Sequence, residues 1–175
     1  GLKLSGTQKV FVGESVQYTA SGWDEYYNPA NLNTVTLEYS DTAGLGAWQG
    51  NTFTAQKAGT TEVAAASGIA RGTLSVQVLG AESVKNLELS FDKTSVVSGG
   101  TAKLTAKATL TDGTTKTVSP SMLTLTAEGG SISTDGVLTA TIPSGTVKVT
   151  AAFGKVTATK TIKIDSAAKQ YALNT

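Results

Sequence analysis

Two stretches of this chain, 86 residues apart, align with each other without a gap. Residues 59–78 read GTTEVAAASGIARGTLSVQV and residues 145–164 read GTVKVTAAFGKVTATKTIKI, so that Val63 matches Val149 and Val76 matches Ile162. We expect the first pair to point inward from the penultimate strand of each half and the second pair to point inward from the last strand. A repeat of this length indicates that one supersecondary unit is built twice. The repeat constrains the fold more than any local motif does, because the fold of one half must serve for the other.

The repeat extends upstream over most of the chain. The further matched pairs are Leu2 with Leu87, Leu4 with Leu89, Gly13 with Gly99, Tyr18 with Leu104, and residues 51–55 with residues 136–140. We therefore predict domain 1 at residues 1–80 and domain 2 at residues 81–165. Residues 166–175 lose the pattern and are either a linker toward a missing module or a frayed terminus. Because the strand pattern is already present at Gly1, we expect the chain to be a piece of a longer polypeptide.

Short segments throughout the chain alternate apolar and polar residues, and Gly, Asn, Asp or Pro separates them. The clearest segments are residues 2–4, 16–18, 35–39, 74–78 and 162–164. Patterns with a helical period are almost absent. Alternation of this kind is typical of antiparallel sheets with one face toward water. The sequence therefore predicts an all-β fold.

The chain contains neither cysteine nor histidine. Without them there is no disulfide framework, no thiolate or imidazole metal site, and no Ser-His-Asp relay. The only adjacent carboxylates, Asp24 and Glu25, point to opposite faces of an extended chain and do not converge as glycoside hydrolysis requires. We therefore predict that the chain is not an enzyme and uses no cofactor.

Charge is sparse and nearly balanced, with 14 Lys and Arg against 13 Asp and Glu. There is no basic stripe for nucleic acid and no long apolar run for membrane insertion, so we expect neither partner. Residues 1–80 hold 4 basic and 6 acidic residues, a net charge of −2, and residues 81–165 hold 9 and 7, a net charge of +2. Opposite signs favour head-to-tail stacking of chains, or they are incidental.

A recurring pattern of Leu-Thr-Ala strands, Asp-Gly turns and Gly-Thr strand starts is similar to that of bacterial Ig-like domains. In the second half it is carried by Leu104-Thr105-Ala106, Asp112-Gly113, Leu138-Thr139-Ala140, Gly145-Thr146 and Val149-Thr150-Ala151. The resemblance covers residues 2–164. One departure is the third strand, where such domains usually place Trp. Tyr39 stands there in domain 1 and Ala127 in domain 2.

The resemblance implies two tandem immunoglobulin-like β-sandwich domains of a secreted or cell-surface bacterial protein. It implies a non-catalytic segment acting as spacer, adhesion or surface-layer assembly module, located outside the cell or on its surface. The expected partners are neighbouring domains of the same longer polypeptide, with cell-wall glycan or another surface protein as a further partner. The alternative is a pair of carbohydrate-binding accessory modules of an extracellular glycan-active enzyme. Fold-level likeness does not choose between these roles.

Aromatic residues gather in domain 1. Tyr18, Tyr39 and Phe53 alternate with other inward positions and are predicted to fill the core where domain 2 uses Leu104, Ala127 and Leu138. The remaining aromatic residues, in or next to turns, are Trp23, Tyr26, Tyr27 and Trp48. They form either a binding surface for sugars or a protein, or loop packing over the end of their own domain. We expect Trp23 to be partly buried and Tyr26 or Tyr27 to be exposed.

Oxygen-bearing side chains accompany these aromatic residues. Asp24, Asn28 and Asp41 are candidate Ca²⁺ ligands, with Glu25 beside them, but their spacing fits no EF-hand loop. The same stretch is equally consistent with a turn that ends at Pro29. We predict no metal site and keep these residues as the candidates if one exists.

Overall fold

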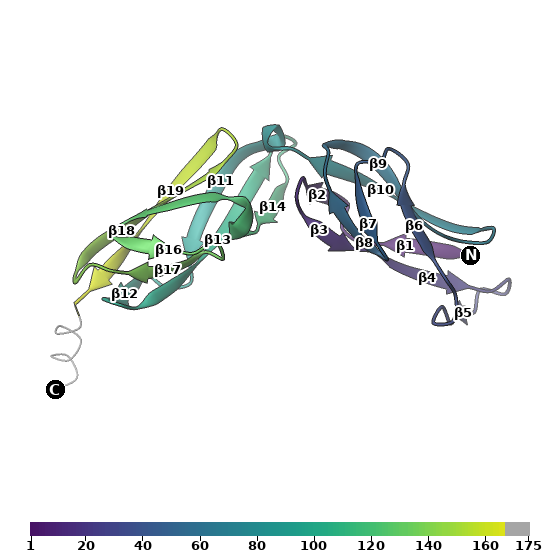
Figure 1. Ribbon diagram of the computed structural model, residues 1–175, viewed down its shortest axis with the longest axis horizontal. Coiled ribbons are helices and arrows are strands. Elements are labelled where there is room, and N and C mark those ends of the chain that lie inside the picture. Colours follow the sequence, from purple (N-terminus) through teal and green to yellow (C-terminus); the bar gives the residue numbers. More distant parts are fainter. Residues whose placement is uncertain (167–175) are drawn as a thin grey trace. The chain divides into compact units, whose positions relative to one another are not determined.

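The computed structural model describes residues 1–166, which form β-strands and two short 3₁₀ turns without an α-helix. The all-β prediction is confirmed. The chain divides into two compact units, Gly1–Gly80 (unit 1) and Ala81–Thr175 (unit 2) (Figure 1). The tail predicted for residues 166–175 lies outside the described residues, apart from Ser166.

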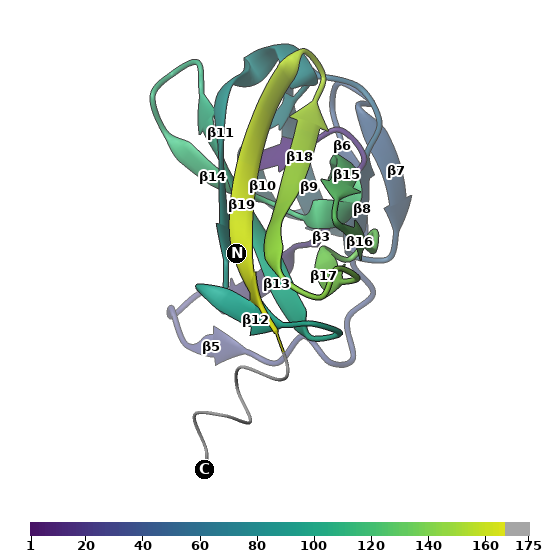
Figure 2. The same cartoon turned by 90° about the vertical axis from the view of Figure 1, so that its left-hand side faces the viewer.

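Unit 2 has the longer uninterrupted strands. Its elements are η1 (Ala81–Ser83), β11 (Val84–Phe91), β12 (Ser95–Val97), β13 (Thr101–Leu110), β14 (Thr115–Val118), η2 (Pro120–Met122), β15 (Thr124–Glu128), β16 (Gly130–Ile132), β17 (Val137–Ala140), β18 (Gly145–Phe153) and β19 (Val156–Asp165). One sheet has the order β11-β13-β17-β16, with β14 paired to β13, and the other has the order β12-β19-β18-β15. Figure 2 shows β12, β19 and β18 side by side.

Unit 1 repeats this arrangement, and its first and third strand positions are shorter or divided. Its elements are β1 (Leu2–Ser5), β2 (Lys9–Phe11), β3 (Ser15–Gln17), β4 (Thr19–Trp23), β5 (Pro29–Ala30), β6 (Glu38–Asp41), β7 (Gly46–Gln49), β8 (Thr52–Ala55), β9 (Gly59–Ser67) and β10 (Ala70–Leu79). The order β2-β10-β9-β6 matches β12-β19-β18-β15 element by element. The sheets β1-β4-β5 and β3-β8-β7 together match the other sheet of unit 2.

Each unit is therefore an immunoglobulin-like sandwich. In unit 2, the sheet of β11, β13, β17 and β16 corresponds to strands A, B, E and D of an immunoglobulin domain. It faces the sheet of β15, β18 and β19, which correspond to strands C, F and G. In both units the short second strand runs parallel to the last strand, β2 beside β10 and β12 beside β19, while the other pairs are antiparallel. The parallel pair lets the chain cross from one sheet to the other at its first strand.

The third strand position is interrupted in unit 1 at Tyr18, between β3 and β4. The Tyr18 N–H donates to the Asn51 carbonyl (3.0 Å) and the Asn51 side-chain amide donates to the Tyr18 carbonyl (2.8 Å). In unit 2 the Leu104 N–H makes the same kind of bond to the Gly136 carbonyl (2.8 Å). At this point each strand changes partner, from β8 to β1 in unit 1 and from β17 to β11 in unit 2.

Strand register confirms the alignment of the two halves. Val63 lies opposite Leu74 and Val149 lies opposite Lys160, each pair displaced by the same 86 residues. Val63, Val149 and Val76 have exposures of 0%, and Ile162 has 3%. The predicted inward positions on the last two strands of each unit are therefore confirmed.

One sequence-based pairing is wrong. Tyr39 lies opposite Ala65, and Leu125 lies opposite Ala151, so Leu125 is the counterpart of Tyr39. Ala127 lies opposite Val149 and corresponds instead to Asp41. The error is two residues, which keeps the same face of the strand, so alternation alone could not reveal it.

The alternation of β13 shows how the sequence builds the core. Ala102, Leu104, Ala106, Ala108 and Leu110 are buried, and the Thr and Lys residues between them are exposed or partly so. Because successive side chains on a strand point to opposite faces, one face becomes apolar and packs on the other sheet. In unit 1 the buried cluster comprises Leu4, Val10, Tyr18, Phe53, Ala55, Val63, Ala65, Val76 and Val78.

Candidate functional site

The β4–β5 hairpin of unit 1 carries three of the four candidate aromatic residues. Trp23 pairs with Pro29 at the end of the two strands, and the chain reverses between them. The Asp24 N–H donates to the Asn28 carbonyl (3.0 Å), and the Tyr27 N–H donates to the Asp24 carbonyl (3.1 Å). Tyr27 has φ of 64° and is the only non-glycine residue with positive φ among the described residues. This is a tight turn followed by a left-handed residue, a frequent form of short hairpin loop.

The Asp24 side chain holds the turn together. Its Oδ1 accepts the N–H groups of Tyr26 (2.8 Å) and Asn28 (2.9 Å), and its Oδ2 accepts the Asn28 side-chain amide (3.1 Å). The backbone and side-chain hydrogen bonds from Asn28, with the one from Tyr26, lower the pKa of Asp24. A carboxylate engaged in this way rigidifies the loop, so the candidate Ca²⁺ ligands Asp24 and Asn28 bind each other in the hairpin.

The two tyrosines at the tip are open to solvent. The exposed fractions are 77% for Tyr26 and 83% for Tyr27, whereas Trp23 is half-buried. The indole of Trp23 lies against Gly1, where an added Cβ would clash with the ring. The expectation that Trp23 packs on its own unit while a neighbouring Tyr stays exposed is confirmed. Packing therefore explains Trp23 but neither tyrosine.

Trp48 belongs to a different environment. It lies on β7, and its ring centroid is 5.0 Å from that of Phe53, 6.0 Å from that of Tyr18 and 6.0 Å from that of Tyr39. The indole is half-buried against the core cluster. The structure therefore does not bring Trp48 to the hairpin tip, and its placement near a turn in the sequence concealed its position in a strand.

Asp41, the third Ca²⁺ candidate, anchors the loop between β6 and β7. Its Oδ2 accepts the Leu45 N–H (2.7 Å) and the Thr61 hydroxyl (3.1 Å), and its Oδ1 accepts the Trp48 indole N–H (3.0 Å). The Thr61 hydroxyl also accepts the Ala43 N–H (3.0 Å). Both carboxylate oxygens of Asp41 thus serve a structural network. Residues 1–166 contain no group of three or more Asp, Glu, His or Cys side chains able to hold a metal ion.

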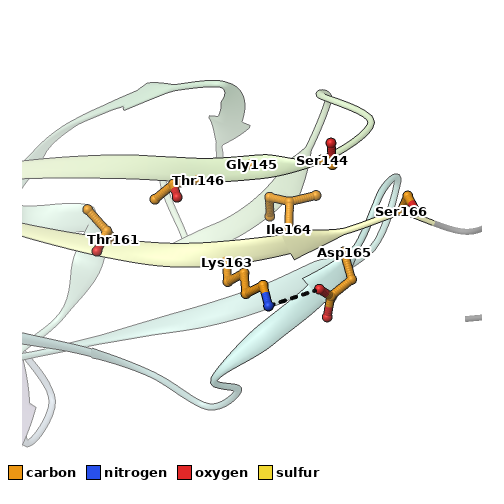
Figure 3. Close-up of a pocket in the computed structure, with 8 residues that line it drawn as sticks. All are labelled: Ser144, Gly145, Thr146, Thr161, Lys163, Ile164, Asp165 and Ser166. Atoms are coloured by element: carbon orange, nitrogen blue, oxygen red, sulfur yellow. Dashed lines mark ion pairs between the residues drawn. The ribbon is translucent and has the colours of Figure 1, made fainter. Parts of the chain in front are cut away.

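A shallow depression occurs at one end of unit 2, where the start of β18 lies beside the end of β19 (Figure 3). Its lining includes Ser144, Thr146 and Thr161, and Lys163 reaches toward Asp165 with an Nζ to Oδ1 distance of 3.6 Å. The hydroxyls have no imidazole or thiolate beside them, because the chain contains neither residue. The depression therefore contains no Ser-His or Cys-His pair.

Ile69 is an exposed apolar residue that sequence reasoning missed. It lies in the two-residue turn between β9 and β10, and its side chain is fully exposed. Leu2 pairs with Gly22 of β4, and the Leu2 backbone also lies against Gly72 of β10. The β4–β5 hairpin and the β9–β10 hairpin therefore both extend past Leu2, at the same end of unit 1. A bulky apolar residue directly after a glycine, Gly68, was the available signal in the sequence.

No helix in the described part of the chain has the length and apolar character that a membrane crossing requires.

No family model matches the sequence, and no curated protein matches it. Among solved structures, domains 5–6 of the S-layer protein SbsC align with a TM-score of 0.42 and 14% identity, covering 95% of this chain and 97% of that one. The D0-D1 domain of intimin aligns with a TM-score of 0.36 and 20% identity, covering 95% and 98%. The Yersinia pseudotuberculosis adhesin InvE aligns with a TM-score of 0.34 and 17% identity, covering 94% and 58%. At these TM-scores the likeness transfers neither a site nor a function.

Proposed function

We propose that the chain is a non-catalytic structural and interaction segment of a bacterial surface or secreted protein, in which tandem immunoglobulin-like modules act as spacer, adhesion or assembly units. The observation that carries this proposal is the repetition itself. Two units use one strand order and one register, and both are stabilised by the same ladder. A chain that repeats a sandwich gains length and surface, which suits display and assembly.

The chemistry of the described residues supports a non-catalytic role. The carboxylates of Asp24 and Asp41 accept hydrogen bonds from groups of unit 1 that hold their own loops in place. In the hydroxyl-lined depression on unit 2 the carboxylate, Asp165, is paired with Lys163 (3.6 Å). None of these places combines a nucleophile, a base and an oxyanion site, which catalysis by acyl or glycosyl transfer requires.

Two measurements test this proposal. Antibodies raised against the chain should label intact cells of the producing bacterium or detect the chain in the culture fluid, and confinement to the cytosol would contradict the surface or secreted setting.

Stretching the chain between two handles should give two separate unfolding events, because each unit has its own core. A single event spanning the whole chain would contradict the spacer built from independent modules.

A second candidate function is favoured by the β4–β5 hairpin. Tyr26 and Tyr27 present two exposed rings that no contact within unit 1 explains. Aromatic rings with a polar edge are suited to stacking on sugars, so the chain would act as a carbohydrate-binding accessory module of an extracellular glycan-active protein.

A further inference from the structure

We propose that the tip of the β4–β5 hairpin, Tyr26 and Tyr27, is a stacking site for neutral polysaccharide. This inference rests on the second candidate function and gives it a site and a ligand class.

The same turn occurs at the equivalent place in unit 2, between β13 and β14. There the Leu110 N–H donates to the Thr114 carbonyl (2.8 Å) and the Gly113 N–H donates to the Leu110 carbonyl (2.9 Å). These bonds repeat those of Asp24 and Tyr27 with a displacement of 86 residues. Gly113 has φ of 87°, and it occupies the position of Tyr27. The fold thus closes this hairpin with glycine in one unit and with tyrosine in the other.

Glycine is the residue that this backbone conformation favours. A left-handed φ brings the Cβ of any other residue close to the following carbonyl, which costs free energy, and a bulky side chain at such a position is a true outlier. Tyr27 does not recover this cost by packing, because its side chain is 83% exposed. The Asp24 hydrogen bonds hold the turn in this conformation, and residues held under such strain cluster at binding and catalytic sites. The Tyr27 ring therefore has a use outside the fold of unit 1.

The size of the exposed patch selects the occupant. Two tyrosines at this exposure present roughly 300–400 Å² of surface, whereas a stable protein interface needs about 800 Å² from each partner. One or two sugar rings fit this area. The hairpin is also rigid, because Asp24 accepts three hydrogen bonds within it, so little conformational entropy is lost on stacking.

The surrounding charge selects neutral glycans over acidic ones. Asp24 and Glu25 are in the same turn as the rings, and no Lys or Arg occurs between Lys9 and Lys57. The Gly1 ammonium lies beside the turn and donates to the Trp23 carbonyl (2.8 Å), which leaves the turn with a net charge of −1. A polyuronate or a phosphate-bearing polymer would therefore meet a negatively charged turn. A neutral chain meets no such repulsion and can use its apolar ring faces against Tyr26 and Tyr27.

Affinity electrophoresis of the whole 175-residue chain tests the site. The gels contain β-glucan, galactomannan, xylan or glycol chitin as neutral probes, and polygalacturonate as the acidic probe. The key variant is Tyr26→Asp/Tyr27→Gly, which transplants the Asp112-Gly113 turn of unit 2. Tyr27→Phe keeps the ring. Ile69→Lys, which transplants Lys155 to the neighbouring hairpin, is the matched control at the same end of unit 1.

We expect at least one neutral polysaccharide, and not polygalacturonate, to retard the parent chain. The transplanted turn should weaken this binding by roughly tenfold or more, as expected for lost aromatic stacking. Its melting temperature should be no lower than that of the parent, because glycine relieves the strain. Tyr27→Phe and Ile69→Lys should bind as the parent does.

Three results would overturn the site: no retardation by any neutral probe, equal retardation of the parent and the transplanted turn, or a lower melting temperature for the transplanted turn. Binding of the hairpin to a protein alone would also overturn it. None of these results touches the spacer proposal, which the antibody and stretching measurements test separately.

Discussion

The two units have the same strand pairing but differ in the residues that point into the sandwich. At equivalent register positions unit 1 has Tyr18, Tyr39 and Asp41 with Thr61, and unit 2 has Leu104, Leu125 and Ala127 with Val147. Strand order and register are unchanged by these replacements. Alternation and strand pairing therefore specify the sandwich. The identity of the inward residues determines only which interactions stabilise each unit. Unit 1 uses aromatic rings and a partly buried polar network, and unit 2 uses aliphatic packing.

Core truncation should have the largest effect. Phe53→Ala removes a fully buried ring that contacts Trp48, and we expect a loss of about 3–5 kcal/mol in the free energy of unfolding. The matched Leu138→Ala in unit 2 should cost about 2–5 kcal/mol. Both tryptophans, Trp23 and Trp48, are in unit 1, so tryptophan fluorescence during urea unfolding reports that unit, and circular dichroism reports both. A loss below 1 kcal/mol at Phe53 would break the equivalence of the two inward positions.

The repeat and the alternation predicted the all-β fold, the inward valines on β9 and β18, and the counterpart of most core residues. These predictions succeeded because burial and pairing act through periods that are visible in one sequence. The role of Trp48 could not be predicted, because its ring packs on side chains of several other segments, among them Tyr18, which is far from it in the sequence. The left-handed conformation of Tyr27 was also hidden, since tyrosine gives no sign of positive φ, although the aligned Gly113 did.

The next largest effect is a loss of stability at high pH that we expect in unit 1 and not at the matching position of unit 2. Burial raises the pKa of Tyr18 to about 12, and its hydroxyl donates to the Thr7 carbonyl (2.7 Å), whereas unit 2 has Leu104 at this position. The native state keeps the proton after the unfolded chain has released it. The contribution of Tyr18 to the free energy of unfolding of unit 1 is therefore fully present below about pH 10. It falls by about 2–3 kcal/mol as the pH rises to 12. Fluorescence-monitored urea unfolding measures this slope, and Tyr18→Phe should reduce it. An unchanged slope in Tyr18→Phe would assign the loss to other groups.

The Asp41 network gives a smaller effect. Asp41→Ala leaves the Trp48 indole N–H, the Leu45 N–H and the Thr61 hydroxyl without their acceptor, and we expect unit 1 to lose about 1–3 kcal/mol. Adding Thr61→Val imports the Ala127 and Val147 pair of unit 2, removes one unpaired hydroxyl and leaves the N–H of the exposed Ala43 to water. The double variant should then recover part of the loss in fluorescence-monitored unfolding. If the double variant is less stable than Asp41→Ala, the aliphatic solution of unit 2 does not transfer to unit 1.

The smallest effect belongs to Asp24, because the β4–β5 hairpin is exposed. The Asn28 hydrogen bonds lower the pKa of Asp24, so the hairpin is stabilised above the ordinary Asp pKa, and this stabilisation is lost as the pH falls through the lowered value. Carboxyl carbon shifts in an NMR titration measure that pKa directly. The amide shifts of Tyr26 and Asn28, whose N–H groups donate to Asp24 Oδ1, should move with it. Asp24→Asn should abolish this pH dependence at both amides while leaving Thr114 in the matching hairpin of unit 2 unchanged. Amide shifts that ignore the Asp24 titration would mean that the carboxylate does not hold the turn, and the rigid display of Tyr26 and Tyr27 would lose its support.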